Sequence, residues 1–314
     1  MRAATIVDGQ ITIAEHPDPE PGTGELLIRV KAAGLNGADL LQRRGMYPPP
    51  PGYPADIPGL EIAGEVIGAG PGVTRFKEGD RVMAVVGGAG QAELAVVHER
   101  AVMPVPERML WDEAGGFPEV FVTAHDALFT QAELAMGDRV CIHGAAGGVG
   151  TAAIQIAATA GALVTATARA SDLHDHLRDL GAHDVLVPDD FPGSGPFDVI
   201  LELIGAVNLA ANLEALALGG RIATIGVGAG ATAEINLLVL MQKRARIHGS
   251  TLRTRPLEQK AAAARLVEQQ VLPGVESGRI KVPVHRTFPL KDAAGAYDLF
   301  AAGGKLGKIV LTMD

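Results

Sequence analysis

The stretch from Arg139 to Gly150, Arg-Val-Cys-Ile-His-Gly-Ala-Ala-Gly-Gly-Val-Gly, decides the fold predicted for the second half of the chain. Its first five residues predict a strand, and a helix is expected from Val149 to Ala160. Gly144, Gly147 and Gly150 are spaced three residues apart. Because glycine has no Cβ, this spacing permits a tight turn, close approach to a pyrophosphate and close helix packing. The motif therefore predicts a dinucleotide-binding βαβ unit.

Strands and helices alternate on both sides of this motif, as expected for a parallel sheet with crossover helices. Ser171 is expected to cap the second helix of the series. A later helix is expected from about Ala206 to Ala217, ended by Gly219 and Gly220. The pattern predicts an α/β, doubly wound fold for this part of the chain.

Residues at the C-terminal ends of the expected strands are the candidate cofactor contacts, because an open parallel sheet binds its ligand there. Gly205 and Gly226 follow two such strands. A kinase-type phosphate loop is not expected, because Gly150-Thr151 lacks the lysine that such a loop needs. The loop residues predicted to contact the cofactor are Gly144, Ala145, Ala146, Gly147, Gly148, Val149 and Gly150.

The first part of the chain has a different pattern. From Met1 to about Glu113, short apolar runs are interrupted by Gly and Pro, which indicates a β-rich domain. A helix from 257 to 270, a turn at Pro273-Gly274 and a strand from 307 to 311 are expected to rejoin that domain. The predicted parts are residues 1–117, 118–254 and 255–314.

The amino-acid composition and net charge disfavour several classes of function. A formal charge of −9 disfavours binding to nucleic acid or to anionic membranes, which leaves a small molecule as the expected partner. Cys141 is the one cysteine, so internal disulfides are impossible. The uncharged stretch 144–168 consists mostly of Gly, Ala and Thr, so no membrane span is expected. The sequence predicts a cytoplasmic protein without a targeting signal.

Several segments follow one another along the chain: Gly34–Asp39, Gly45–Pro48, Gly59–Glu61, Thr123-Ala124, the glycine motif and Gly307–Leu311. In this order they resemble the signature of the medium-chain dehydrogenase/reductase superfamily, in particular its quinone oxidoreductases. The Gln42-Arg43 pair and the proline run after Tyr47 are most similar to the tumour-suppressor-induced branch. The resemblance implies a GroES-like β-rich catalytic domain, a Rossmann domain, a cleft between them and a homodimer.

The residues at the positions of the family's zinc ligands predict that no metal is bound. Zinc-dependent members use Cys, a His beside Glu, and a second Cys or acid. Here Leu60 stands in place of that His, and Asn36 and Asp39 lie in the first ligand segment. Cys141 alone cannot supply the missing thiolates.

Without a metal, side-chain donors must stabilise the charge that develops during hydride transfer. Tyr47 and Asn36 are the predicted catalytic residues, because a phenol and an amide can donate to an oxyanion or to the nicotinamide ribose. Related reductases often have a second tyrosine where this chain has Leu41. By resemblance, Thr123 contacts the nicotinamide end of the cofactor.

The second strand predicts NADPH as the cofactor. NADH binding usually requires an acid about 20 residues beyond the glycine motif. That region instead offers Arg169 and Ser171, which suit a 2′-phosphate. Asp172, where the nearest relatives have lysine, and Pro188, where they tend to have tyrosine, oppose this interpretation.

The predicted function is NADPH-dependent reduction of a quinone or activated carbonyl. A 2-enoyl thioester reductase is the alternative within enzymes, because it uses the same fold and hydride donor. A crystallin-like or RNA-binding use of the fold is the alternative of another class. His125, Arg253 and Arg255 are expected on the solvated surface and are left out of the site.

Overall fold

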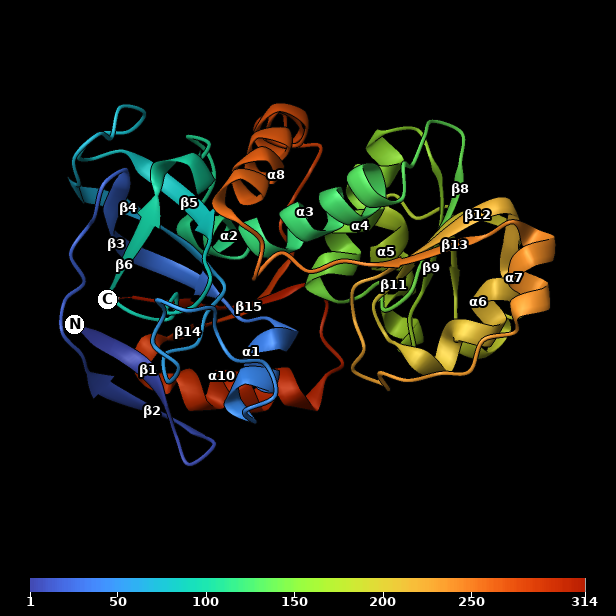
Figure 1. Ribbon diagram of the computed structural model, residues 1–314, viewed down its shortest axis with the longest axis horizontal. Helices are drawn as coiled ribbons and strands as arrows, with labels where there is room; N and C mark the ends of the chain where they lie inside the picture. The colour runs from blue at the N-terminus through green and yellow to red at the C-terminus, as the bar shows by residue number, and fades with distance from the viewer. Residues whose placement is uncertain (314) are drawn as a thin grey trace. The chain divides into compact units, whose positions relative to one another are not determined.

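A computed structural model describes residues 1–313 as two compact units (Figure 1). The first unit comprises Met1–Val122 together with the chain from Leu252 onward. The second is the continuous segment Thr123–Thr251. Helix α3, Pro118–His125, contributes residues to both.

The first unit is built on a seven-stranded, mainly antiparallel sheet. Its order is β14-β15-β3-β4-β5-β7, and β6 also pairs with β3. Only β14 and β15 are parallel to each other, and β15 returns antiparallel to β3, with Val310 opposite Gly34. The strands are β3 (Glu25–Gly34), β4 (Glu61–Ala69), β5 (Arg81–Val85), β6 (Leu94–His98), β7 (Val102–Pro104), β14 (Val284–Pro289) and β15 (Lys308–Thr312).

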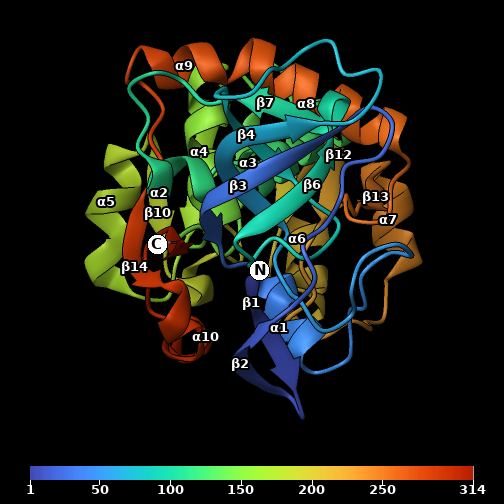
Figure 2. The same ribbon diagram turned by 90° about the vertical axis from the view of Figure 1, so that its left-hand side faces the viewer.

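Short helices and a two-stranded ribbon surround this sheet. Figure 2 shows α8 and α9 beside β7, and the β1–β2 ribbon near α10 at the opposite end of the unit. The helix predicted at 257–270 is confirmed as α8, whereas the turn predicted at Pro273-Gly274 is wrong, because both residues lie in α9. The elements are β1 (Arg2–Val7), β2 (Gln10–Glu15), α1 (Gly37–Arg43), α2 (Trp111–Gly115), α8 (Leu257–Gln270), α9 (Leu272–Glu276) and α10 (Ala293–Ala302).

The second unit contains a six-stranded parallel sheet in the order β10-β9-β8-β11-β12-β13. Helices α4 and α5 cover one face, and α6 and α7 cover the other (Figure 1). The predicted doubly wound fold is confirmed. The elements are β8 (Arg139–Ile142), α4 (Gly148–Thr159), β9 (Leu163–Thr167), α5 (His174–Asp179), β10 (Asp184–Leu186), β11 (Phe197–Glu202), α6 (Leu209–Ala215), β12 (Leu216–Thr224), α7 (Leu237–Lys243) and β13 (Arg246–Gly249).

Two local predictions in this unit are wrong. Ser171 lies in a short 3-10 turn and makes no side-chain cap. Gly219 and Gly220 lie inside β12 and do not end a helix, because α6 stops at Ala215. Leu216 is fully buried and pairs with Phe197 of β11, so burial in the sheet overrides helix continuation here.

Within residues 1–313, no helix has the length and apolar character that crossing a membrane requires.

Candidate functional site

The glycine motif forms a tight loop between β8 and α4. Gly144 has a φ of +64°, which favours glycine. A Cβ on Gly150 would lie 2.6 Å from the Cα and carbonyl oxygen of Ala145, so only glycine allows α4 to start this close to the loop. Gly147 precedes the helix in an extended conformation, which leaves the first N–H groups of α4 available to an anion. This geometry suits a pyrophosphate.

Two further predicted contacts lie at the C-terminal ends of β11 and β12. Gly205 has a φ of +126°, and a Cβ there would lie 2.6 Å from the carbonyl oxygen of Gly230. A Cβ on Gly226 would lie 2.2 Å from the carbonyl oxygen of Leu203. Both glycines therefore allow two backbone segments to pack closely at the edge where a parallel sheet binds its ligand.

A buried polar network supports this edge, and it was not predicted from the sequence. One carboxylate oxygen of Glu202 accepts the backbone N–H of Gly205 at 2.8 Å, and the other accepts Nδ2 of Asn212 at 2.7 Å. Asn212 Oδ1 lies 2.8 Å from Nε2 of His143, whose Nδ1 lies 3.0 Å from Thr167 Oγ1. Burial lowers the pKa of His143. The sequence feature that could have pointed to this network is Glu202, an acid at the end of the mostly apolar strand β11.

The predicted determinants of cofactor choice lie on the loop after β9. Arg169 and Ser171 are both exposed, so they are accessible to a ligand phosphate. Asp172, the opposing acid, is exposed on the same loop. Thr123 is buried in α3 at the first position of the second unit.

In the first unit, Asn36 belongs to a buried ionic group. Lys308 Nζ lies 2.6 Å from Glu61 Oε1 and donates to Asn36 Oδ1 at 2.7 Å. Asn36 Nδ2 donates to the same Glu61 oxygen at 2.9 Å. A Cβ on Gly34 would lie 2.2 Å from that oxygen, so glycine makes room for it. Glu61 and Lys308 both lie in segments that carry the family resemblance, but no role was predicted for either. Their pairing was not predicted from the sequence.

Asp39 fixes the start of α1 beside this group. Its carboxylate accepts the backbone N–H groups of Asn36 at 2.8 Å and Gly59 at 3.0 Å. Burial raises the pKa of Asp39 to about 6, although these two hydrogen bonds oppose the shift. Asp39 therefore anchors the backbone of Asn36 while Lys308 orients its side chain.

Tyr47 lies against Arg253, and the surface position expected for Arg253 is wrong. Arg253 is 3% exposed and donates to the carbonyl oxygens of Gly87 and Tyr47, each at 2.8 Å, and to Gln42 Oε1 at 2.5 Å. Its guanidinium lies 4.9 Å from the centre of the Tyr47 ring. These acceptors and the aromatic face compensate the buried charge. His125, also expected at the surface, is buried beside Phe129.

Glu119, at the second residue of α3, was not predicted from the sequence. Its backbone N–H donates to Glu61 Oε2 at 2.9 Å. Burial, and then the charge of Glu61, raises the pKa of Glu119 to about 8. The pKa of the Tyr47 phenol is also raised, first by burial and then by the charge of Glu119. A carboxylic acid and a phenol, both favoured in their protonated forms, therefore share this region.

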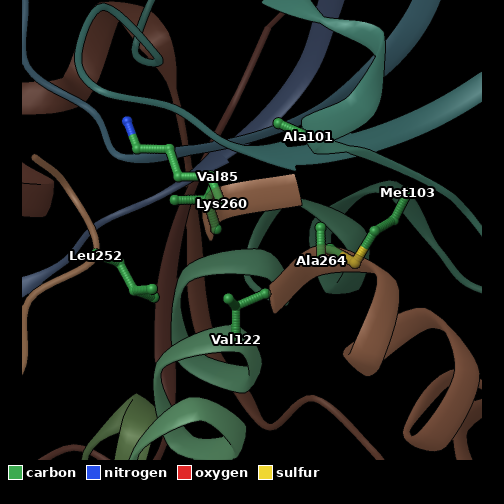
Figure 3. Close-up of a pocket in the computed structure, with 7 residues that line it drawn as sticks. All are labelled: Val85, Ala101, Met103, Val122, Leu252, Lys260 and Ala264. Carbon is green, nitrogen blue, oxygen red and sulfur yellow. The ribbon is translucent and has the colours of Figure 1, made fainter. Parts of the chain in front are cut away.

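The first unit also contains a small pocket, which Lys260 helps to line (Figure 3). Its volume is about 10 Å³, which is the room for about one water molecule. The Lys260 ammonium points away from Met103 and Ala264, and its aliphatic chain passes close to Val85. Burial lowers the pKa of Lys260. The lining residues are Val85, Ala101, Met103, Val122, Leu252, Lys260 and Ala264.

The donor set of the first unit does not resemble a zinc site. Leu60 is 2% exposed and apolar, and Asn36 is hydrogen-bonded to Lys308 and Glu61. Among residues 1–313, no group of three or more His, Cys, Asp or Glu side chains is arranged to hold a metal ion.

The glycine loop on a parallel sheet, joined in one chain to a β-rich unit with buried donors, defines a two-domain nicotinamide-dependent oxidoreductase. Residues 22–107 match the family model described as an alcohol dehydrogenase GroES-like domain, and residues 148–269 match the zinc-binding dehydrogenase model. The chain belongs to the medium-chain dehydrogenase/reductase superfamily.

Named relatives and solved structures agree with this assignment. The quinone oxidoreductase of Rattus norvegicus is 33% identical over 307 residues, which covers 94% of this chain and 91% of that protein. The human quinone oxidoreductase is 32% identical, with the same coverage. A mycobacterial protein solved in complex with NADPH is similar with a TM-score of 0.88 and 27% identity, covering 99% of this chain and 100% of that one.

Proposed function

We propose that this protein is an NADPH-dependent, zinc-independent reductase of quinones or similarly activated carbonyls. The observation that carries the proposal is the donor set of the first unit, where apolar Leu60 stands at the zinc-ligand position and Asn36 is hydrogen-bonded to Lys308 and Glu61. Tyr47 and Asn36 then take the part of a Lewis acid. Overall identity of 33% to quinone oxidoreductases supports the substrate class. The glycine loop between β8 and α4 supports the assignment of a dinucleotide cofactor.

The side chains have separate roles in this reaction. The bound nicotinamide supplies the hydride. Tyr47 provides an O–H donor for the oxyanion that develops on the substrate. The Asn36 amide is oriented by Lys308 and Glu61, so it positions the reactants more than it donates a proton. Arg253 holds the Tyr47 backbone and ring in place.

NADPH oxidation with quinones, enones, aldehydes and enoyl thioesters, before and after treatment with a chelator, tests the proposal. Turnover with quinones that survives chelation is the expected result. Stoichiometric zinc with loss of activity on chelation would contradict zinc independence. A preference for enoyl thioesters would favour the alternative enzyme, and absence of turnover with every acceptor would favour a non-catalytic use of the fold.

Arg169→Ala is expected to reduce kcat/KM for NADPH by about ten-fold or more, because a charged hydrogen bond to phosphate is worth roughly 1.5–3 kcal/mol. The value for NADH should change little, because NADH lacks the 2′-phosphate. Steady-state kinetics with both cofactors measure the effect.

Arg178→Ala is the matched control for this prediction, because Arg178 is exposed in the same unit and pairs with Asp175. It should leave the cofactor preference unchanged. A wild-type preference for NADH, or an Arg169→Ala protein with an undiminished preference for NADPH, contradicts the assignment of Arg169.

We also propose that the chain forms a homodimer through the exposed apolar surface of α7 and β13. Leu237 is 61% exposed, Leu238 60% and Met241 71%, and β13 is an edge strand of its sheet. Met241→Glu should shift the sedimentation coefficient from dimer to monomer. Met136→Glu, at an 84% exposed methionine of the same unit, should not. A monomeric wild-type protein contradicts this proposal.

A further inference from the structure

His143 lies at the point of the parallel sheet where the strand order reverses. It follows β8 directly, and β8 has β9 on one side and β11 on the other. In a doubly wound sheet of this order, the half that carries the glycine loop binds the adenosine mononucleotide, and the other half binds the second mononucleotide. The first half here is β8, β9 and β10, and the second is β11, β12 and β13. His143 therefore stands at the boundary between the two halves.

The buried ring of His143 makes one hydrogen bond toward each half. Its Nδ1 lies 3.0 Å from Oγ1 of Thr167, the last residue of β9. Its Nε2 lies 2.8 Å from Oδ1 of Asn212, in the helix α6 that follows β11. Phe191 packs edge-on against the ring, with the two ring centres 4.5 Å apart. Both ring nitrogens are used inside the protein, and packing holds the ring in one orientation.

The hydrogen-bond pattern determines the tautomer of His143. The Glu202 carboxylate can only accept, so Asn212 turns its Nδ2 toward Glu202, at 2.7 Å, and its Oδ1 toward His143. Because that oxygen is an acceptor, Nε2 of His143 must carry the ring proton. Nδ1 then accepts from the Thr167 hydroxyl. Burial lowers the pKa of His143, which favours this neutral ring.

On the β9 side, the hydrogen bond reaches the loop predicted to select the cofactor. Thr167 is followed by the loop with Arg169 and Ser171, the residues assigned to the 2′-phosphate. The Thr167 carbonyl oxygen accepts the backbone N–H of Ala145, in the glycine loop, at 3.1 Å. The His143 ring holds the side chain of the same threonine. Loss of this bond loosens the start of the loop.

On the β11 side, the hydrogen bonds continue to the turn at Gly205. One carboxylate oxygen of Glu202 accepts the backbone N–H groups of Ile204 at 2.6 Å and Gly205 at 2.8 Å. Asn212 holds the other oxygen of that carboxylate. The bond from His143 to Asn212 therefore fixes the group that shapes this turn.

We propose that His143 is a positioning residue that holds the two cofactor-binding halves of the sheet in register. It acts through Thr167 on the half for the adenosine 2′-phosphate and through Asn212 on the half for the nicotinamide mononucleotide. The proposal rests on the nicotinamide cofactor of the proposed function and is independent of the hydride acceptor. Loss of one of the two hydrogen bonds should weaken the binding of one half of the cofactor only.

Two conservative variants separate the two hydrogen bonds. The amide of Gln reaches the place of Nε2, so His143→Gln keeps the bond to Asn212 and loses the bond to Thr167. It should weaken binding of adenosine 2′,5′-bisphosphate by about three- to ten-fold, the range of one net hydrogen bond, and spare reduced nicotinamide mononucleotide. The shorter amide of Asn reaches the place of Nδ1, so His143→Asn should show the reverse. Calorimetry measures the first fragment, and ligand-observed NMR measures the second.

Thr167→Val tests the β9 side of the proposal through a double-mutant cycle. Added to His143→Asn, it should weaken binding of the bisphosphate by about three- to ten-fold. Added to His143→Gln it should cost little, because the bond is already absent. His183→Gln is the matched control, since His183 Nδ1 accepts the backbone N–H of Val164 at 3.1 Å near the opposite end of β9. It should bind both fragments as wild type does.

Nitrogen NMR of the wild-type protein, labelled at its histidine rings, tests the proposal without any substitution. The signal that His143→Gln removes should show a proton on Nε2 and none on Nδ1 at neutral pH. A proton on Nδ1 overturns the proposal. Equal weakening of both fragments in both variants, or no change in either, also overturns it, even if quinones are reduced.

The binding measurements separate this proposal from the proposed function, because they need no hydride acceptor. The expected fragment pattern without turnover on any acceptor supports the role of His143 and overturns the proposed function. A wild-type protein that binds neither NADPH nor NADH overturns both.

Discussion

Lys308→Met is expected to destabilise the first unit by about 3–5 kcal/mol, because removing one partner of a buried ion pair leaves the other charge uncompensated. The side chains of Lys308 and Glu61 are 3% and 0% exposed, and their charged atoms lie 2.6 Å apart. Asp39 is buried nearby, and its charge adds to the repulsion on Glu61. Lys308 also holds Asn36, so activity should fall with stability.

Urea unfolding of the variant measures this loss. The double variant Lys308→Met with Glu61→Gln should recover a large part of it, because the orphaned charge is removed as well. Lys291→Met, at an exposed lysine of the same unit, should stay within about 0.5 kcal/mol of wild type. An equal loss in the single and double variants would show that the ion pair is not the cause.

Gly150→Ala is expected to weaken cofactor binding by at least about ten-fold and to lower stability by roughly 1–3 kcal/mol, as overpacking does. The new Cβ would lie 2.6 Å from backbone atoms of Ala145, which cannot rotate away as a side chain could. The start of α4 must therefore move away from the loop. Calorimetric titration with NADPH and thermal unfolding measure the two effects.

Gly228→Ala is the matched control for stability in the same unit, because its Cβ would meet no atom within 4 Å. Its unfolding midpoint should match that of wild type. If Gly150→Ala binds NADPH as tightly as wild type does, the loop between β8 and α4 is not the phosphate-binding site.

Local patterns predicted the parts of the fold that local physics determines. The helix predicted at 257–270 is α8, and the glycine spacing predicted the connection from β8 to α4. Ser171 and Gly219 were misassigned because their usual preferences for caps and helix ends were overridden by the surrounding structure. Intrinsic propensity is one contribution to the conformation of a residue, and tertiary packing can outweigh it.

The site was predicted less completely, because its main contacts join distant parts of the chain. Glu61 and Lys308 are paired only once β15 lies against β3. Arg253 stands in a polar stretch that suggests solvent, and its carbonyl acceptors come from separate loops of the first unit. Glu119 had no local signal, since its environment comes from several different elements.

The position of Lys308 on the last strand has a consequence for synthesis on the ribosome. The strand that receives it, β3, emerges early, whereas the cation that neutralises Glu61 is translated only with β15, after the whole of the second unit. The continuous segment Thr123–Thr251 holds its whole sheet within itself and can fold while the chain is still growing. The first unit must wait with an open sheet edge and an unpaired acid until β15 has been translated, so its ionic group can form only after the second unit has been synthesised.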